Sequence, residues 1–226
     1  MDREVYLGIE TSTKFSSVAI IEEEKTLSEY SMYTPSNHNE KIFLMLEAVM
    51  EHTELKYDEI KGIGVSAGPG MFTSLRTGIS IAKTLAFIKE IPIKAINTLD
   101  AIQAVLKIQA PVIVIIPAGK GEVYAGFYQN EEKKYLILKP EKIKDHVKKK
   151  TYITGPAVIQ CLPFFEKEKN ISIITPPILF PPASVVAFLA KERIKKEGSD
   201  DVFELEPFYL RPTDAEIHRD KKSNRR

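Results

Sequence analysis

The sequence predicts an α/β fold made of two lobes that share one topology, and three observations support this prediction. Apolar runs of strand length alternate with longer stretches that have the period of an amphipathic helix. The order of three strands followed by alternating helices and strands occurs twice along the 226 residues. The apolar fraction of 43% is sufficient for a core, and this length corresponds to one large domain or to two paired halves.

The first half of the chain predicts a three-stranded meander, followed by helices that alternate with short buried strands. The predicted strands are residues 5–9, 18–21, 27–33, 60–66 and 91–96, and the predicted helices are residues 40–50 and 73–89. Three glutamates at residues 22–24 form the turn before the third strand. The predicted order is therefore βββαβαβ.

The second half repeats this pattern after a helix at residues 99–108. Its predicted strands are residues 112–116, 122–128, 135–138, 152–154 and 171–174, and the last two are each followed by a helical stretch. The two halves agree in topology but not in sequence, which indicates two ribonuclease-H-like lobes with mixed sheets in βββαβα order. We expect an N-terminal lobe at residues 1–97, a C-terminal lobe at residues 98–218 and a basic tail at residues 219–226.

Composition and charge predict a cytoplasmic protein without a membrane segment. Cys161 is the only cysteine, so an intrachain disulfide is impossible, as is usual in a reducing compartment. The first residues lack the apolar stretch of a signal peptide, and the longest apolar run, residues 111–118, is too short to cross a bilayer. The formal charge is +1, but lysines at 148–150 and the tail form local basic clusters. Such clusters either keep a surface solvated or add salt-sensitive affinity for RNA.

Two glycine- and hydroxyl-rich turns are candidates for binding a phosphate group. Glu10, Thr11 and Ser12 follow the first strand on a tight turn whose hydroxyls and backbone N–H groups could face an anion. Gly68 and Gly70 flank a proline before the second helix, whose N-terminus is the positive end of its dipole. A plain hairpin and a turn that only directs the helix explain the two segments equally well.

The two helices of the first half carry more apolar and small side chains than one core requires. The earlier helix has five apolar residues in succession, which point in every direction around its axis. The later helix has small residues at four-residue spacing along one face, where another helix can approach closely. We expect these helices to bind a partner through Ile42, Phe43, Met45, Leu46 and Val49 on the first and through Ser74, Leu75, Gly78, Ala82 and Ala86 on the second.

The sequence predicts no catalytic residue and no metal site. None of the four histidines has a second histidine four residues away, and a catalytic metal generally needs about three protein ligands. The chain has no Gly-x-Ser-x-Gly motif, and Cys161 lies in an apolar stretch without a nearby base.

Five motifs follow one another along the chain. They are Leu7-Gly8-Ile9-Glu10-Thr11-Ser12-Thr13 with Ser17-Val18-Ala19, then His38-Asn39-Glu40, then Gly68-Pro69-Gly70-Met71-Phe72-Thr73-Ser74-Leu75-Arg76-Thr77-Gly78, then Lys120-Gly121-Glu122-Val123-Tyr124, and Pro207-Phe208-Tyr209-Leu210-Arg211-Pro212. Together these motifs resemble the TsaB (YeaZ) family. The block around Gly68 and Gly70 is the most specific of them, and the resemblance spans nearly the whole chain.

The resemblance implies an actin-like, Hsp70-like fold and a role without catalysis. TsaB proteins pair with the related catalytic subunit TsaD through their first two helices, which form a four-helix bundle, and the ATPase TsaE is a third component. TsaD carries the metal and transfers threonylcarbamoyl to the adenosine next to the anticodon of certain tRNAs. The resemblance therefore implies tRNA contact through the complex, and ATP or ADP at the level of the complex rather than as a cofactor of this chain. An apolar interface without its partner predicts that the isolated chain forms a homodimer.

The chain departs from related sequences at three places. Only His38 remains of the two histidines that bind metal in the catalytic relative, Ser74 stands where glycine is usual, and residues 117–119 replace an Asp-Ala-Arg run. Two alternatives to a scaffold remain open. One is an ATP-binding or ATP-hydrolysing enzyme that uses Thr11, Ser12 and the turn from Gly68 to Gly70, and the other is a peptidase that acts on TsaD.

Overall fold

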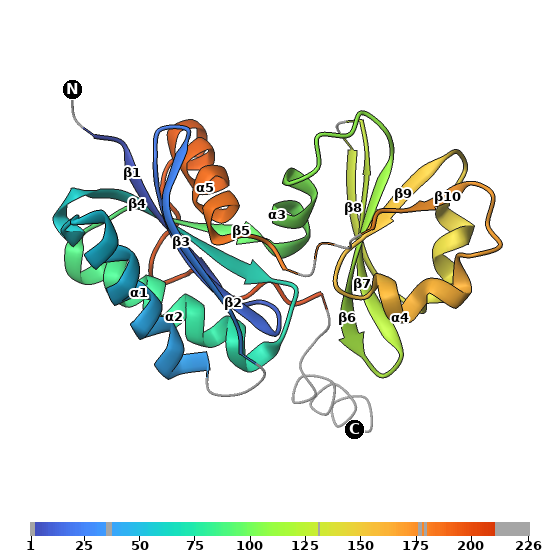
Figure 1. The fold of residues 1–226 in the computed structure, drawn as a ribbon, viewed down its shortest axis with the longest axis horizontal. Coiled ribbons are helices and arrows are strands. Elements are labelled where there is room, and N and C mark those ends of the chain that lie inside the picture. Colours follow the sequence, from blue (N-terminus) through green and yellow to red (C-terminus); the bar gives the residue numbers. More distant parts are fainter. Residues whose placement is uncertain (1–2, 35–37, 131, 176–177, 179, 211–226) are drawn as a thin grey trace, which may run out of the picture.

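The computed structural model describes residues 3–34, 38–130, 132–175, 178 and 180–210, and it contains two five-stranded mixed sheets. Figure 1 shows the two sheets side by side, each with its own helices. In the first sheet the strand order is β3 (Lys25–Tyr33), β2 (Phe15–Glu22), β1 (Val5–Glu10), β4 (Ile60–Gly68) and β5 (Ile93–Asn97). In the second sheet it is β10 (Ile171–Ile173), β9 (Thr151–Thr154), β6 (Val112–Gly119), β7 (Glu122–Gln129) and β8 (Glu132–Leu138). The predicted fold class is confirmed.

The first lobe begins with the predicted meander. Its elements are β1 (Val5–Glu10), β2 (Phe15–Glu22), β3 (Lys25–Tyr33), α1 (His38–Thr53), a 3₁₀ turn η1 (Tyr57–Glu59), β4 (Ile60–Gly68), α2 (Phe72–Lys89) and β5 (Ile93–Asn97). Strand β1 is antiparallel to β2 and parallel to β4, so it lies at the centre of the sheet. All six of its residues are buried, because helices cover both faces of the sheet.

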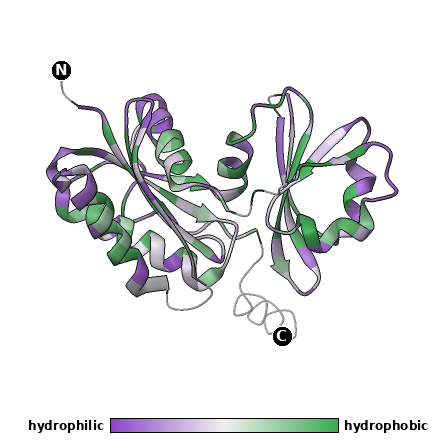
Figure 2. Ribbon diagram, viewed as in Figure 1, coloured by the Kyte–Doolittle hydropathy of each residue, from purple (hydrophilic) through white to green (hydrophobic). Residues whose placement is uncertain are grey.

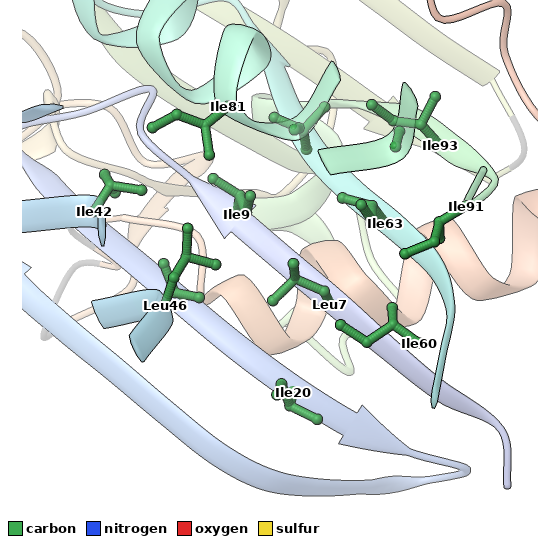
Figure 3. Packing of buried hydrophobic residues seen from close by; sticks show 14 of the residues in the cluster. Leu7, Ile9, Ile20, Ile42, Leu46, Ile60, Ile63, Ile81, Ile91 and Ile93 are labelled. Carbon is green, nitrogen blue, oxygen red and sulfur yellow. The ribbon is translucent and has the colours of Figure 1, made fainter. Parts of the chain in front are cut away.

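The main core lies between the first sheet and the helices α1 and α2. Leu7 and Ile9 of β1 and Ile63 of β4 contact apolar side chains of α1 and α2 in one cluster of buried residues (Figure 3). The alternation of side chains along β1 sends Leu7 and Ile9 to this face. Tyr6 lies on the opposite face, in a cluster with the helix α5 (Ala183–Glu197).

The second lobe repeats the meander and ends with short elements. Its elements are α3 (Thr98–Ala104), β6 (Val112–Gly119), β7 (Glu122–Gln129), β8 (Glu132–Leu138), η2 (Pro140–His146), β9 (Thr151–Thr154), α4 (Val158–Cys161), η3 (Leu162–Phe164) and β10 (Ile171–Ile173). The parallel pairs β6–β9 and β9–β10 extend the meander into a mixed sheet. Apolar clusters cover both faces of this sheet, and α3 contributes Leu99 and Ile102 to one of them.

The last helix, α5 (Ala183–Glu197), packs against the first sheet although it follows the second sheet in the chain. It therefore lies in the first lobe, whereas the predicted boundaries assign these residues to a C-terminal lobe at 98–218. The approach is close because α5 presents alanines to glycines of the sheet. A Cβ atom at Gly8 would overlap the carbonyl oxygen of Ala183, and one at Gly64 would lie 2.6 Å from the carbonyl oxygen of Val186.

A carboxylate from β3 holds the N-terminal end of α5. Glu29 accepts hydrogen bonds from Ser17 Oγ at 2.9 Å and from Ser184 Oγ at 2.6 Å. A negative group at this position also stabilises the positive end of the helix dipole. Glu29 and Ser184, which are 155 residues apart in the chain, thus join β3 to α5 at one edge of the sheet.

Candidate functional site

The turn after β1 is organised around a fully buried carboxylate. Glu10 is 0% exposed, and its Oε1 atom accepts hydrogen bonds from the backbone N–H of Ser12 at 2.6 Å and from the Ser12 hydroxyl. Its Oε2 atom accepts a hydrogen bond from the hydroxyl of Ser66 on β4. The strand pairing of β1 with β4 brings these residues together, because Ile9 lies beside Val65.

Burial raises the pKa of Glu10 to about 7, since desolvation disfavours the charged form. The hydrogen bonds from Ser12 and Ser66 oppose this shift but do not outweigh it. A carboxyl group with this pKa is partly protonated near neutral pH. It occupies the backbone N–H and the hydroxyl of Ser12 in place of an external anion.

The remaining members of the predicted phosphate site also pack against each other. Thr11 Oγ1 donates a hydrogen bond of 2.8 Å to the carbonyl oxygen of Ser74, and Met71 N donates one of 2.8 Å to the carbonyl oxygen of Ser12. A Cβ atom at Gly70 would overlap the carbonyl oxygen of Ser12. The turn from Gly68 to Gly70, which contains a cis Gly68–Pro69 peptide bond, therefore packs directly on the turn after β1.

A cavity of about 270 Å³ lies beside these turns, between the two lobes. It is lined by Ser12, Thr13, Lys14, Phe15, Tyr33 and Met71 from the first lobe and by Ile116, Pro117, Pro156 and Gln160 from the second. The ring of Phe15 stacks on Phe180 with the centroids 4.6 Å apart. The structure thus brings Ser12 to the edge of a mostly apolar cavity, but Glu10 and Thr11 do not line it.

The predicted partner-binding residues are mostly buried within this chain. Ile42, Met45, Leu46 and Val49 of α1 are at most 2% exposed and contact the first sheet in the main core. The prediction that they bind a partner is therefore wrong in its choice of helix face. A run of five apolar residues indicates that a helix is covered on more than one side, but it does not show which of the five face the helix's own sheet.

The small-residue row of α2 requires the same correction. Ser74, Leu75, Gly78, Ala82 and Ala86 are each buried, and a Cβ atom at Gly78 would overlap Thr11 Oγ1. The row lets α2 approach the turn after β1 closely, and it does not face outward. Gly78 serves the contact between α2 and its own sheet.

The outward surface of the two helices consists of different residues, which we call the α1–α2 face: Phe43, Leu44, Thr73, Thr77, Ser80 and Thr84. Phe43 is 55% and Leu44 is 60% exposed. The four α2 residues are small, and their spacing of four, three and four places them along one side of the helix. Phe43 is the one predicted partner residue that lies on this face. Leu44 and the hydroxyl row were not among the residues predicted from the sequence. The spacing of small polar residues along α2 is the signal that indicates the row.

Hydroxyls of the α1–α2 face are satisfied within α2 itself. Thr77 Oγ1 donates a hydrogen bond of 3.1 Å to the carbonyl oxygen of Thr73, and Thr84 Oγ1 donates one of 2.8 Å to the carbonyl oxygen of Ser80. Such bonds let a threonine present its methyl group to a neighbour without leaving its hydroxyl unpaired. The face can therefore be covered by another helix without a penalty from these hydroxyls.

The chain segment after α5 runs along α2 at the border of the α1–α2 face, where Leu205 and Pro207 line a groove together with Ser80 and Thr84. Lys83 Nζ donates hydrogen bonds of 3.1 Å to the carbonyl oxygens of Phe203 and Leu205. The ring of Tyr209 stacks on Phe72 with the centroids 5.4 Å apart, and Arg76 Nε donates to its hydroxyl. The segment leaves the α1 part of the face uncovered, because Phe43 and Leu44 keep their high exposure.

The described residues contain no group of three or more histidine, cysteine, aspartate or glutamate side chains that could hold a metal. His52 is bonded to the Tyr30 hydroxyl and to the carbonyl oxygen of Ala48. The side chain of His38 and all of His218 lie outside the described part. Cys161 is buried, which raises its pKa to about 11 and makes its thiol a poor nucleophile.

A family model described as "TsaD: tRNA N6-adenosine threonylcarbamoyltransferase" matches residues 32–218. The tRNA threonylcarbamoyladenosine biosynthesis protein TsaB of Escherichia coli is 28% identical over 217 residues, which cover 91% of this chain and 94% of the relative. The chain belongs to the TsaB (YeaZ) family. The TsaB protein of Bacillus subtilis is 31% identical over 124 residues, or 54% of each chain. The solved structure of YeaZ from Pseudomonas aeruginosa aligns with a TM-score of 0.76 at 22% identity, covering 92% of this chain and all of that one.

The structural likeness establishes that the family's fold is present here. The two mixed sheets form the actin-like arrangement of two ribonuclease-H-like lobes that the sequence motifs implied. The motif residues before α2 form the contact between the turns at Ser12 and Gly70. No helix among the described residues is long and apolar enough to cross a membrane.

Proposed function

We propose that this chain is a non-catalytic dimerisation and scaffold subunit of the tRNA N6-threonylcarbamoyladenosine transferase complex. It would support a TsaD-like catalytic subunit in modifying the adenosine next to the anticodon, together with a TsaE-like ATPase in the cytoplasm. Its relatives are named for the biosynthesis of threonylcarbamoyladenosine in tRNA, and the matching family model is that of the transferase. The tRNA would be bound through the complex.

The observation that carries this proposal is the exposure of Phe43 and Leu44 on the α1–α2 face. Figure 1 shows α1 and α2 side by side on the outer surface of the first sheet, away from the second lobe. Two adjacent, large apolar side chains that are more than half exposed cost free energy in water and favour a contact that covers them. The small side chains along α2 let two further helices lie close to this surface.

Support for a role without catalysis comes from the turn after β1. An ATP-hydrolysing enzyme of the actin type needs turn donors that face the nucleotide, but here Ser12 donates both of its groups to Glu10. The charged form of the Glu10 carboxyl group would also repel a phosphate at this turn. Isothermal calorimetry that detects stoichiometric ATP binding to the isolated chain would favour the ATP-binding alternative.

The experiment that tests the scaffold is threonylcarbamoyl transfer to tRNA by purified TsaD-like and TsaE-like proteins, supplied with the adenylate intermediate. We expect transfer to require this chain and to be lost with the Phe43→Glu, Leu44→Glu variant. Ile159→Glu is the matched control, because Ile159 is 58% exposed on the second lobe. Equal transfer with and without the chain would contradict the proposal.

In isolation, the same face would pair with a second copy of this chain. Light scattering should give a dimer for the wild-type chain and the Ile159→Glu control, and a monomer for the Phe43→Glu, Leu44→Glu variant. A monomeric wild-type chain would remove the homodimer from the proposal but leave the contact with the catalytic subunit to be tested by the transfer assay.

A further inference from the structure

The charges of this chain are divided unevenly between its two lobes. Residues 105–174, which contain the second sheet, carry 12 lysines and 7 aspartates and glutamates. Residues 1–104 and 175–210 carry 14 lysines and arginines and 21 aspartates and glutamates. Residues 211–226 carry the remaining 6 lysines and arginines and 3 aspartates and glutamates. The net charge of +1 therefore conceals a positive segment around the second sheet beside a negative first lobe.

The topology of the second sheet collects several of these lysines at one end. In the strand register, one row of paired residues crosses the sheet from β8 to β10: Lys133, Tyr128, Val112, Tyr152 and Ser172. Strands β6, β9 and β10 are parallel and all begin at this row, so the loops that precede them meet there. The basic end of the lobe consists of the lysines in these loops: Lys107, Lys148, Lys149, Lys150 and Lys169.

Backbone hydrogen bonds hold these loops together. Tyr152 N donates to the carbonyl oxygen of Pro111 at 2.9 Å, and Thr151 N donates to the carbonyl oxygen of Asn170 at 2.8 Å. The lysines beside them are exposed, and Figure 2 shows hydrophilic residues in the loops at the upper and outer parts of this lobe. The basic end is therefore a fixed set of loops with solvent-facing ammonium groups.

No described carboxylate lies within 4.0 Å of an ammonium group of the basic end. The nearby lysines that do form ion pairs lie elsewhere: Lys133 binds Asp100, and Lys144 binds Glu168. Lys150 lies 6.0 Å from the centroid of the Tyr152 ring. The positive charge of the basic end is thus available to an external anion.

A polar groove of about 420 Å³ opens at the same end of the sheet. Lys149 lines it together with Gln103, Gln109 and Asn130, which carry amide side chains, and with Tyr128, which carries a phenol. Amide groups can donate to phosphate oxygens and can donate to or accept from hydroxyl groups. A strand of alternating phosphates and ribose hydroxyls matches this combination of lysines and amides.

We propose that the basic end of the second lobe binds the phosphate backbone of RNA. The choice of RNA over another polyanion rests on the proposed function, because the family's role concerns tRNA, and on the amide-lined groove. The contact lies on the lobe opposite the α1–α2 face, so this chain can bind a protein partner and an RNA at the same time (Figure 1). The chain then contributes directly to holding the RNA.

The test is fluorescence anisotropy of a labelled, unmodified tRNA transcript with the full chain over a range of KCl concentrations. In the Lys148→Glu, Lys149→Glu, Lys150→Glu variant, we expect affinity to fall at least ~10-fold and the salt dependence of log K to become shallower by about 2. The matched control is Lys25→Glu, Lys61→Glu, Lys196→Glu, which changes the net charge equally through exposed first-lobe lysines that form no ion pair with a described residue. It should change affinity by less than about 3-fold.

Equal losses in both triple variants would overturn the proposal, because binding would then depend on net charge alone. Unchanged binding in the Lys148 triple variant would overturn it as well. So would binding of the wild-type chain to vesicles of anionic phospholipid without binding to the tRNA, which would assign the basic end to a membrane. The Phe43→Glu, Leu44→Glu variant should keep its tRNA affinity. Anisotropy therefore tests RNA binding, and the transfer assay tests the scaffold function independently.

Discussion

Arg193 of α5 donates a hydrogen bond of 2.9 Å to the Oδ2 atom of Asp100 on α3, and this contact joins the two lobes. Asp100 is 5% exposed and also accepts hydrogen bonds from Tyr128 at 3.0 Å, Tyr135 at 2.6 Å and Lys133 at 3.1 Å. These three residues belong to the second sheet, whereas α5 packs on the first. One carboxylate thus connects the helix of one lobe to the sheet of the other.

We expect Asp100→Asn to lower the free energy of unfolding by about 3 kcal/mol, because it leaves two cations without their common anion. Burial alone would raise the pKa of Asp100, but the hydrogen bonds from Tyr135 and the charge of Lys133 hold it below its ordinary value. The stabilisation is therefore present above the ordinary pKa of aspartate and is lost as the pH falls through the lower folded value. Urea unfolding from pH 3 to pH 7 measures this effect, and Asp201→Asn on the surface is the control. Equal stability of Asp100→Asn and wild type at pH 7 would contradict the prediction.

Glu10 predicts a pH dependence of the opposite sign. Its folded pKa of about 7 lies above the unfolded value, so the native state binds the proton more tightly. Its contribution is fully present below the unfolded pKa and declines as the pH rises toward 7. We expect Glu10→Gln to flatten the stability profile between about pH 5 and pH 7, because the wild-type chain loses roughly 1.4 kcal/mol for each pH step of one across this window. Parallel profiles for the variant and the wild type would exclude a raised pKa at this position.

The contact between Gly78 and Thr11 predicts a coupled pair of substitutions. Gly78→Ala improves helix propensity by about 1 kcal/mol, but the new Cβ overlaps Thr11 Oγ1, and overpacking of this kind costs about 1–3 kcal/mol. We expect a net loss of stability in Gly78→Ala that is smaller in the Thr11→Ala background. A double-mutant cycle by urea unfolding measures the coupling. Ser80→Ala on the exposed side of α2 is the control and should be neutral or slightly stabilising.

We expect that removing the ammonium group of Lys83 lets the segment after α5 open locally. This ammonium group holds the carbonyl oxygens of Phe203 and Leu205, and Lys83→Met keeps the apolar stem but removes both bonds. We expect hydrogen exchange at the amides of Leu205 and Phe208 to accelerate about 10-fold, while the amides of β1 keep their protection. Ile88→Ala, at a position of α2 that is 67% exposed and lies outside the groove of Lys83 and Leu205, tests whether any change on this helix has the same effect. Uniform acceleration across the first lobe would indicate global destabilisation instead.

The sequence was sufficient to predict the order of the strands and helices, because the two-residue and 3.6-residue periods are local properties. The meander at residues 5–33 and the helix before each following strand lie where the periods placed them. The motifs around Glu10 and Gly68 were also sufficient to indicate the family, because two turns that pack against each other tolerate few residue types at each position. Those motifs did not reveal that Ser12 donates to Glu10 rather than to a ligand, because that choice depends on a contact with β4.

The tertiary structure decided which neighbour each buried residue contacts. An apolar or small residue in the sequence indicates that its side chain avoids water, but not which neighbour covers it. For this reason Ile42 and Gly78 were predicted to bind a partner, although they contact this chain's own sheet and turn. Helix α5 shows the same limit, because its alanines do not encode that they fit Gly8 and Gly64 more than 100 residues earlier. Local periodicity determines where helices and strands form. Close packing between distant segments determines which face of each helix is buried, and only the folded chain brings those segments together.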